Sequence, residues 1–552
     1  MTRTRTAVLA ALLAFTLCNS LLSAKWGLPD GATAETTSTW AVDTVAPLGP
    51  LNEANNLFTR RGVDDVIYPV FHYVVLAGAY APYIAVALMT GELANPSSDF
   101  PYGAAEPTTF FVHLTLIASL VSALMAVGCV LLSYLIARET FGVLAALWTA
   151  LLAALVPPLA YYGAMPNLDV PYLFWTMLSV WMLLRAARLQ NTASYLWCGV
   201  CASLAVATKD QAAGFLITLP IVIPLLVRCG LRREGKPDGP LAILRDRRVW
   251  VAALAAAVTF VIANNLVTGL DGYRRHLAFA DEFYAANLAA DGPGLLARQP
   301  ALLAHSSSLL VQMVGIPALL LIVAGVWATV RERRRVALFL LLSPLGYYAA
   351  IIVPTVAHSR YLLGVVLLLL PFAGHAIVLG LASRRALLRV SACVALAGAV
   401  VWQGLLIAHL HRTLAHDSRR AMEAVIRERV PAGTVIESST QARYLPRISD
   451  AYRYSIVGNS FSSTSYNLVG DALTLEALKA RNPAYVLVLA DSWVSGDPTR
   501  VEEAQIRAYY DALLSGQAGY EIVADLRTPT WLPYRQITAG TQPRSILLRR
   551  SD

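Results

Sequence analysis

Charged residues are scarce in this chain. They make up 14% of its 552 residues, and hydrophobic residues make up 57%, whereas soluble proteins carry about 25% charged residues. Apolar runs close to the roughly 20 residues that span a bilayer recur up to about residue 409. This composition excludes an ordinary soluble enzyme and predicts a polytopic α-helical membrane protein.

Long apolar runs are absent after residue 409, where charges become frequent. The chain therefore divides into a membrane domain, 1–409, and a small C-terminal domain, 410–552. No Gly-rich phosphate loop, metal-ligand cluster or nucleophile elbow occurs in the C-terminal domain, so its sequence indicates no second activity. Its alternation of strand and helix patterns predicts an α/β fold. The segments concerned are Thr434–Ser438 and Tyr485–Ala490 as strands, and Thr413–Arg429 and Val501–Leu514 as helices.

Cysteine is also sparse, with six residues and none in 410–552. The C-terminal domain therefore has no disulfide framework. Cys198 and Cys201 form a C-x-x-C pair inside a predicted membrane helix. A pair of buried apolar thiols explains this spacing better than a metal or redox site.

Basic residues gather in alternate loops of the membrane domain. Such loops are cytoplasmic by the positive-inside rule, so the net charge of +9 follows from membrane topology and does not indicate nucleic-acid binding. The loops contain Arg3 and Arg5, Arg138, Arg185 and Arg188, the run 228–248, the run 331–335, and Arg384, Arg385 and Arg389.

Placing all these loops in the cytoplasm requires an even number of crossings before Arg138. Three apolar segments lie in that interval, at 7–24, 68–89 and 107–137, so one of them should not span. Segment 68–89 begins Tyr68-Pro69 and is the best candidate for an interfacial or re-entrant helix on the outer face. Residues 25–106 then form one large external loop with interfacial helices.

The remaining apolar segments bring the expected number of spans to about eleven, including the uncleaved first helix. The N-terminus is then cytoplasmic and the C-terminal domain extracytoplasmic. The other spans are expected at 107–137, 141–162, 170–188, 194–208, 212–228, 249–268, 309–330, 336–355, 361–382 and 389–409.

Four ionisable residues stand at the ends of different apolar segments, and this topology places all four on the outer face: Asp43, Asp169, Lys209 and Arg360. Charges at such positions are costly and commonly functional. Each has a structural alternative, since Lys209 and Arg360 could be snorkelling anchors and Asp169 could cap the helix that begins at Val170. Their convergence on one face favours a shared site.

The four residues suit a transfer reaction in which phosphate is the leaving group. Asp43 could act as the general base for an acceptor hydroxyl. Lys209 and Arg360 could stabilise the charge that develops on phosphate oxygens. Asp169 could orient the acceptor or hold Lys209 in place.

Five segments follow one another along the chain: TSTWAVDTVAP (37–47), YPVFHY (68–73), YYGAMPNLDVPYLFW (161–175), ATKDQAA (207–213) and HSRYLL (358–363). In this order they resemble segments of C-type glycosyltransferases, a group that includes dolichyl-phosphate-mannose protein mannosyltransferases and lipid A aminoarabinose transferases. TSTWAVDTVAP is similar to their first external loop, whose aspartate is catalytic. The chain departs from many relatives at Thr44, where a second acidic residue is common, and at Val70, where a second proline is common.

The resemblance implies a C-type glycosyltransferase fold in the plasma membrane and inverting transfer of one hexose or pentose from a polyprenyl-phosphate carrier. The acceptor would be a hydroxyl of a glycan, lipid or protein of the cell envelope. Such enzymes generally need no metal, although Asp43, Glu53 and Asp169 could bind a divalent cation, as in the oligosaccharyltransferase branch.

Four further residues are candidates for the substrate groove: Tyr68, His72, His358 and Tyr361. All four have an alternative, because Tyr and His are also common at membrane interfaces. An alternative function for the whole chain is a transporter or flippase of lipid-linked sugars. No repeated half with paired broken helices supports that alternative, and a non-catalytic scaffold would leave the four external charges unexplained.

Overall fold

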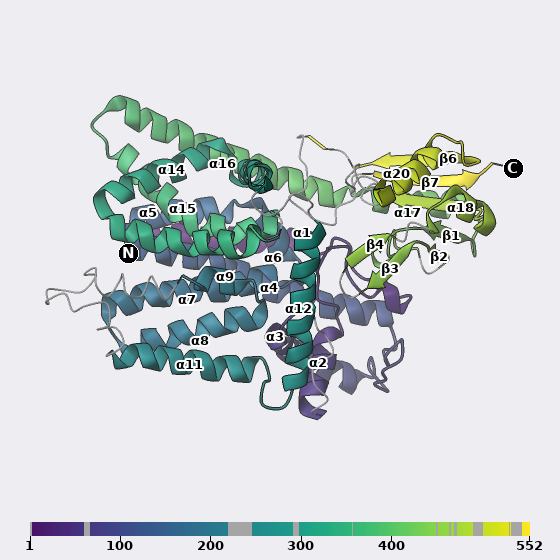
Figure 1. Cartoon of the computed structure of the whole chain (residues 1–552), viewed down its shortest axis with the longest axis horizontal. Helices are drawn as coiled ribbons and strands as arrows, with labels where there is room; N and C mark the ends of the chain where they lie inside the picture. Colours follow the sequence, from purple (N-terminus) through teal and green to yellow (C-terminus); the bar gives the residue numbers. More distant parts are fainter. Residues whose placement is uncertain are drawn as a thin grey trace.

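The protein is a helical bundle with a small mixed α/β domain at one end (Figure 1). In Figure 1 the marks for the N- and C-termini lie at opposite ends of the molecule. The computed structural model describes residues 3–59, 67–218, 246–290, 297–355, 357–448, 451–462, 465–468, 472–489, 501–528, 530–531 and 544–551.

The helices of the bundle are long, apolar and roughly parallel in Figure 1. Small residues let neighbouring helices approach closely. A Cβ on Gly325 would lie 1.9 Å from the carbonyl oxygen of Phe372, so only glycine permits this contact between α14 and α15. The main helices are α1 (Arg3–Ser23), α4 (Pro107–Phe141), α7 (Asp169–Leu189), α8 (Thr192–Thr208), α11 (Arg247–Ala263), α14 (Gln299–Tyr347), α15 (Ser359–Leu381) and α16 (Ala386–Ala415).

Within the described residues, seven helices are long and apolar enough to cross a membrane, or eight if one bent pair is a single span. This confirms a multi-pass membrane protein, whereas eleven crossings remain a prediction. The bent pair is α5 (Val143–Ala154) and α6 (Pro157–Ala164), with 61° between the two axes. A single helix was expected over 141–162. Pro157 ends that continuity, because proline disfavours the helical conformation in the residue before it, and Val156 is extended with φ −73° and ψ 113°.

Two other predicted segments differ in detail. The helices expected at 309–330 and 336–355 are joined in α14, which is followed by the π-helical turn η3 (Tyr348–Ile352). Of the helix expected over 212–228, the structure describes α9 (Ala212–Leu216), and residues 219–228 lie outside the described residues.

The external loop expected over 25–106 contains a short 3-10 turn η1 (Ala34–Thr36) and two helices, α2 (Gly49–Thr59) and α3 (Phe71–Thr90). By length and composition α3 could itself cross a membrane, so its interfacial position stays a prediction. α12 (Leu270–Ala290) stands crosswise to the bundle helices in Figure 1.

The C-terminal domain is built on a five-stranded mixed sheet of order β2-β1-β5-β7-β6. β5 alternates along its length, with Tyr485, Leu487 and Leu489 in one apolar cluster and Val486 and Val488 in the other. This period of two buries both faces of the strand. The strands are β1 (Val435–Ser438), β2 (Arg453–Ile456), β5 (Tyr485–Leu489), β6 (Tyr520–Arg527) and β7 (Arg544–Arg550), with a separate hairpin of β3 (Asn459–Ser462) and β4 (Ser465–Leu468).

Helices cover both faces of this sheet. Met422 and Ile426 of α17 (Ser418–Arg429) pack on one face. Leu478 of α18 (Leu475–Arg481) and Leu513 of α20 (Val501–Leu514) pack on the other. The expected α/β character is therefore confirmed, and β1, β5, α17 and α20 lie within or at the predicted segments.

Candidate active site

Asp43 stands at the tip of a tight turn in the first external loop. The Ala41 amide donates to Thr39 Oγ1 at 3.3 Å, and Thr44 Oγ1 donates to the Ala41 carbonyl at 3.3 Å. Asp43 itself has φ 55°, a left-handed conformation that non-glycine residues adopt rarely and Asp more readily than most. Strained backbone of this kind is often kept at functional positions.

The turn is fastened to the segment that precedes α7. Thr44 and Asn167 form an isolated antiparallel bridge, and the Val45 amide donates to the Pro166 carbonyl at 2.7 Å. Asn167 Oδ1 in turn accepts the backbone amide of Asp169 at 2.9 Å. The predicted residues Asp43 and Asp169 are thereby held near each other by backbone contacts.

Arg360 reaches this turn from the first residues of α15. Its guanidinium donates to a carboxylate oxygen of Asp43 and, at 3.3 Å, to the hydroxyl of Tyr361. The Asp43 side chain is 31% exposed and that of Arg360 is 16% exposed. The pair is therefore half-buried and open to a ligand.

Lys209 and Asp169 form a second ion pair, which is buried. Lys209 Nζ donates to Asp169 Oδ1 at 2.7 Å, and the two side chains are 5% and 2% exposed. The rings of Tyr68, Tyr172 and Tyr361 surround Nζ at 5.4, 5.8 and 6.0 Å. Cation–π attraction from three rings adds to the ion pair in fixing this ammonium group.

Tyr361 joins the two ion pairs into one cluster. Its ring centroid lies 5.0 Å from the Arg360 guanidinium carbon and 6.0 Å from Lys209 Nζ. The structure thus brings together all four charged residues singled out in the sequence, with Tyr68 and Tyr361 between them.

The charge balance of this cluster keeps Asp43 ionised. Burial by itself would raise the pKa of Asp43, but the positive charges of Arg360, Lys209 and Arg443 outweigh it and lower the pKa from 3.8. Asp43 is consequently a carboxylate at neutral pH, held in contact with a cation.

Part of the chain and its fold match known proteins. Residues 108–262 match the family model for dolichyl-phosphate-mannose-protein mannosyltransferase. No curated protein sequence matches the chain significantly. Among solved structures, ArnT from Cupriavidus metallidurans bound to undecaprenyl phosphate aligns over 99% of this chain and 98% of its own, at 14% identity and a TM-score of 0.50.

An archaeal oligosaccharyltransferase gives a similar result. AglB from Archaeoglobus fulgidus, in complex with an inhibitory peptide and a dolichol-phosphate, aligns over 98% of this chain and 76% of its own, at 11% identity and a TM-score of 0.52. The chain has the C-type glycosyltransferase fold. The resemblance expected from the sequence motifs is therefore confirmed at the level of the fold.

Two residues of this candidate site were not singled out from the sequence. Asn167 is buried and fixes the position of Asp169; its place two residues before Asp169 in the PNLD turn could have suggested this role. Arg443 belongs to the 3-10 turn η4 (Ala442–Tyr444) of the C-terminal domain and contributes to the electrostatics of Asp43. No sequence pattern pointed to it.

The two predicted histidines differ in their surroundings. His358 is exposed next to Arg360, with its ring 5.4 Å from that of Tyr361. Although part of its side chain is exposed, burial of the rest and the charge of Arg360 lower its pKa to about 4, so it is neutral near pH 7. His72 is buried in the first turn of α3, and in the described part of the chain neither ring nitrogen has a hydrogen-bond partner.

A divalent cation would have to compete with protein cations at this site. Asp43 and Asp169 are already paired with Arg360 and Lys209, and Glu53 is buried in α2. The absence of a metal requirement remains a prediction from the resemblance.

Proposed function

We propose that the protein is a polyprenyl-phosphate-dependent glycosyltransferase that moves a single sugar to an acceptor hydroxyl on the outer face of the membrane. The contact between Asp43 and Arg360, with Lys209 beside them, is the observation that carries the proposal. A carboxylate that could act as the base and two cations lie next to one another there. The structures of ArnT with undecaprenyl phosphate and of AglB with dolichol-phosphate support the class of carrier.

In the proposed reaction the acceptor oxygen attacks the anomeric carbon of the donor sugar. The bond between that carbon and the donor phosphate oxygen breaks, and the configuration inverts. Asp43 takes the proton of the acceptor hydroxyl. Arg360 and Lys209 stabilise the negative charge that grows on the departing polyprenyl phosphate.

Arg360 changes partner during this cycle. Without donor it pairs with Asp43 and keeps the pKa of this carboxyl low, which makes Asp43 a weak base. A bound donor phosphate competes for the same guanidinium, because Arg binds phosphate and carboxylate through the same donor geometry. Asp43 then loses part of its cationic partner, and its pKa rises to a value more useful for proton transfer.

Lys209 has a different part in this scheme. Its ion pair with Asp169 and the three surrounding tyrosine rings hold it in one position. A fixed charge stabilises a transition state without reorganising during the reaction. Lys209 therefore supplies a constant positive potential, while Arg360 makes the direct contact.

The site would face outward. Arg443 of the C-terminal domain influences Asp43, so the cluster lies at the end of the bundle that carries this domain in Figure 1. The positive-inside pattern of the loops puts that end outside the cytoplasm.

A reconstitution assay tests this function. Purified protein in lipid vesicles is incubated with labelled polyprenyl-phosphate hexoses and pentoses and with lipid, glycan and protein fractions from a deletion strain. The wild type should release polyprenyl phosphate and label one acceptor fraction, and Asp43→Asn should do neither. Donor that crosses the vesicle membrane without release of polyprenyl phosphate would instead identify a transporter. Mass spectrometry of the labelled product would identify the sugar and its acceptor.

A further inference from the structure

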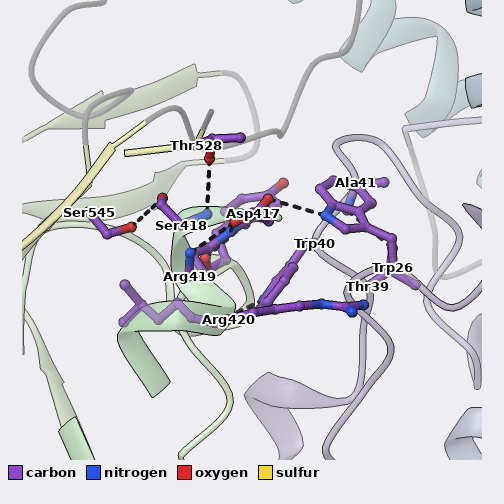
Figure 2. A network of polar contacts seen from close by, with 12 residues as sticks. Trp26, Thr39, Trp40, Ala41, Asp417, Ser418, Arg419, Arg420, Thr528 and Ser545 are labelled. Atoms are coloured by element: carbon purple, nitrogen blue, oxygen red, sulfur yellow. Dashed lines mark hydrogen bonds and ion pairs between the residues drawn. The ribbon is translucent and has the colours of Figure 1, made fainter. Parts of the chain in front are cut away.

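A fully buried ion pair of the C-terminal domain lies against the first external loop (Figure 2). Arg419 donates from Nε and Nη2 to the two carboxylate oxygens of Asp417, at 2.9 and 2.8 Å. The two side chains are 0% and 1% exposed. Asp417 also caps α17 by accepting the Arg419 amide at 3.0 Å.

The remaining polar groups of the pair reach outside α17. Arg419 Nη1 donates to the Tyr444 carbonyl at 3.0 Å, next to Arg443. Trp26 Nε1, which follows α1, donates to Asp417 Oδ2 at 3.1 Å. The pair therefore connects three segments that are far apart in the sequence, the start of the first loop, the start of α17 and the turn η4.

Trp40 is the residue in contact with the pair that lies nearest to Asp43 along the chain. The guanidinium carbon of Arg419 lies 4.1 Å from the Trp40 ring centroid, and Figure 2 shows the indole beside α17. Trp40 is 1% exposed, and its Nε1 donates to the Leu445 carbonyl at 2.9 Å. The C-terminal domain thus holds this indole by a stacked cation on its face and a hydrogen bond at its edge.

Only two residues separate Trp40 from Asp43, whose carboxylate the proposed mechanism uses. Trp40 and Ala41 begin the turn that has Asp43 at its tip in a left-handed conformation. The far side of the turn is fastened to Asn167 of the membrane domain. Because the turn is held on both sides, Asp43 can keep a left-handed conformation that it would leave in a free loop.

We infer that Asp417 and Arg419 are positioning residues for Asp43, through which the C-terminal domain sets the geometry of the base. This inference rests on the proposed function, because it takes Asp43 as the base. Buried ion pairs often contribute little net stability compared with apolar residues of similar size, yet they can fix one arrangement of the groups around them. The cost of misplacing a reacting group by 1 Å can reach about 100-fold in rate.

Two substitutions test the inference in the full-length protein. Arg419→Lys keeps the charge but loses the planar stacking and the bidentate contact, and Asp417→Asn keeps the shape of its side chain. Both should lower kcat for transfer by about 10- to 100-fold, with the Kd for undecaprenyl phosphate within twofold of wild type. A purely structural role would lower the melting temperature and leave the kcat of the folded fraction unchanged, which would overturn the inference.

The chain offers a matched control in the same domain. Arg481 donates to both carboxylate oxygens of Glu437 at 2.8 and 2.9 Å, and this pair joins α18 to β1, neither of which carries a site residue. Glu437→Gln should reduce stability without changing kcat. An equal loss of kcat in Glu437→Gln and Arg419→Lys would show a general effect of domain stability and overturn the inference.

Hydrogen–deuterium exchange gives a readout that needs no activity. Arg419→Lys should speed amide exchange over residues 39–45 and leave exchange over β1 unchanged. Glu437→Gln should speed exchange over β1 and leave exchange over residues 39–45 unchanged. Unchanged exchange over 39–45 in both Arg419→Lys and Asp417→Asn would overturn the inference, and so would faster exchange with unchanged kcat. Failure of the proposed function would give a different result, because the wild type and Asp43→Asn would then transfer sugar equally or not at all.

Discussion

Lys209 Nζ lies 2.7 Å from Asp169 Oδ1, and neither side chain is more than 5% exposed. Arg360 and Asp43, in contrast, form a pair that is half-exposed. The site therefore contains one cation that is fixed by the protein and one that a ligand can reach. The predictions below follow from this difference.

Removing the carboxylate of Asp43 should separate binding from chemistry. Asp43→Asn should abolish transfer and bind undecaprenyl phosphate several-fold more tightly than wild type, because Arg360 loses its internal partner and the ligand loses a repelling charge. Microscale thermophoresis in detergent would measure the affinity. Glu521→Gln, which breaks an exposed ion pair with Arg549 between β6 and β7, is the control and should alter neither quantity. Weaker binding by Asp43→Asn would contradict the exchange of partners by Arg360.

Arg360 should be sensitive to geometry as well as to charge. Arg360→Met should lower kcat by about 10²–10³, the usual effect of removing one donor to a developing anion. Arg360→Lys should restore only part of the rate, since an ammonium group cannot make the bidentate contact. Full recovery with lysine, measured as kcat on the same donor, would show that charge alone is required.

Lys209→Met should damage both folding and activity. Stability should suffer because the pair is buried and the substitution leaves Asp169 charged and without its partner. Breaking a buried ion pair from one side costs about 3–5 kcal/mol. The double variant Asp169→Asn/Lys209→Met should recover much of the melting temperature while transfer stays low. Recovery of both would mean that Lys209 is only structural.

The Asp43–Arg360 pair should stabilise the fold at neutral pH and lose this contribution only in acid. The folded-state pKa of Asp43 is lowered, so the pair contributes fully above the unfolded pKa of 3.8, and this contribution is lost as the pH falls through the lower folded value. Thermal melts of the wild type and Asp43→Asn should therefore differ at pH 6 and converge as the pH falls below about 4. A constant difference across that range would exclude this linkage.

Gly27 provides a way to disturb Trp40 without touching the C-terminal domain. Gly27 has φ +60°, and a Cβ there would lie 2.5 Å from the Cβ of Trp40. Gly27→Ala should lower kcat and alter tryptophan fluorescence through Trp40. Gly433 also has a positive φ, +82°, but a Cβ there would meet no atom within 4 Å. The control Gly433→Ala should therefore lower the melting temperature and leave kcat unchanged. An equal loss of kcat in both variants would show that backbone strain, and not the displacement of Trp40, lowers the rate.

The sequence was most informative where a physical constraint is strong. Apolar runs predicted the helices, and charges at the ends of these runs singled out four residues that the structure brings together: Asp43, Asp169, Lys209 and Arg360. The pairing itself was not predictable, because which cation meets which carboxylate depends on how helices pack over separations of 317 and 40 residues.

Other features left no local trace in the sequence. The bend after Ala154 was missed because the apolar composition of 141–162 predicted a single helix. Pro157 within this segment was the signal that the helix breaks. Strands β6 and β7 were missed. β7 pairs with β5, which precedes α20 in the chain, and β6 carries a bulge between Ile522 and Ala524 that breaks its alternation. Arg443 belongs to a domain whose sequence shows no catalytic motif, and only docking of that domain brings its charge toward Asp43.

α16 ends at Ala415 and α17 begins at Ser418, so only two residues join the last bundle helix to the C-terminal domain. A helix turns by about 100° for each residue. Inserting one residue near the end of α16 would therefore swing the whole domain around the helix axis, whereas inserting four would bring it almost back into phase, about one turn farther out. The number of residues in α16 therefore sets the orientation of the C-terminal domain relative to Asp43.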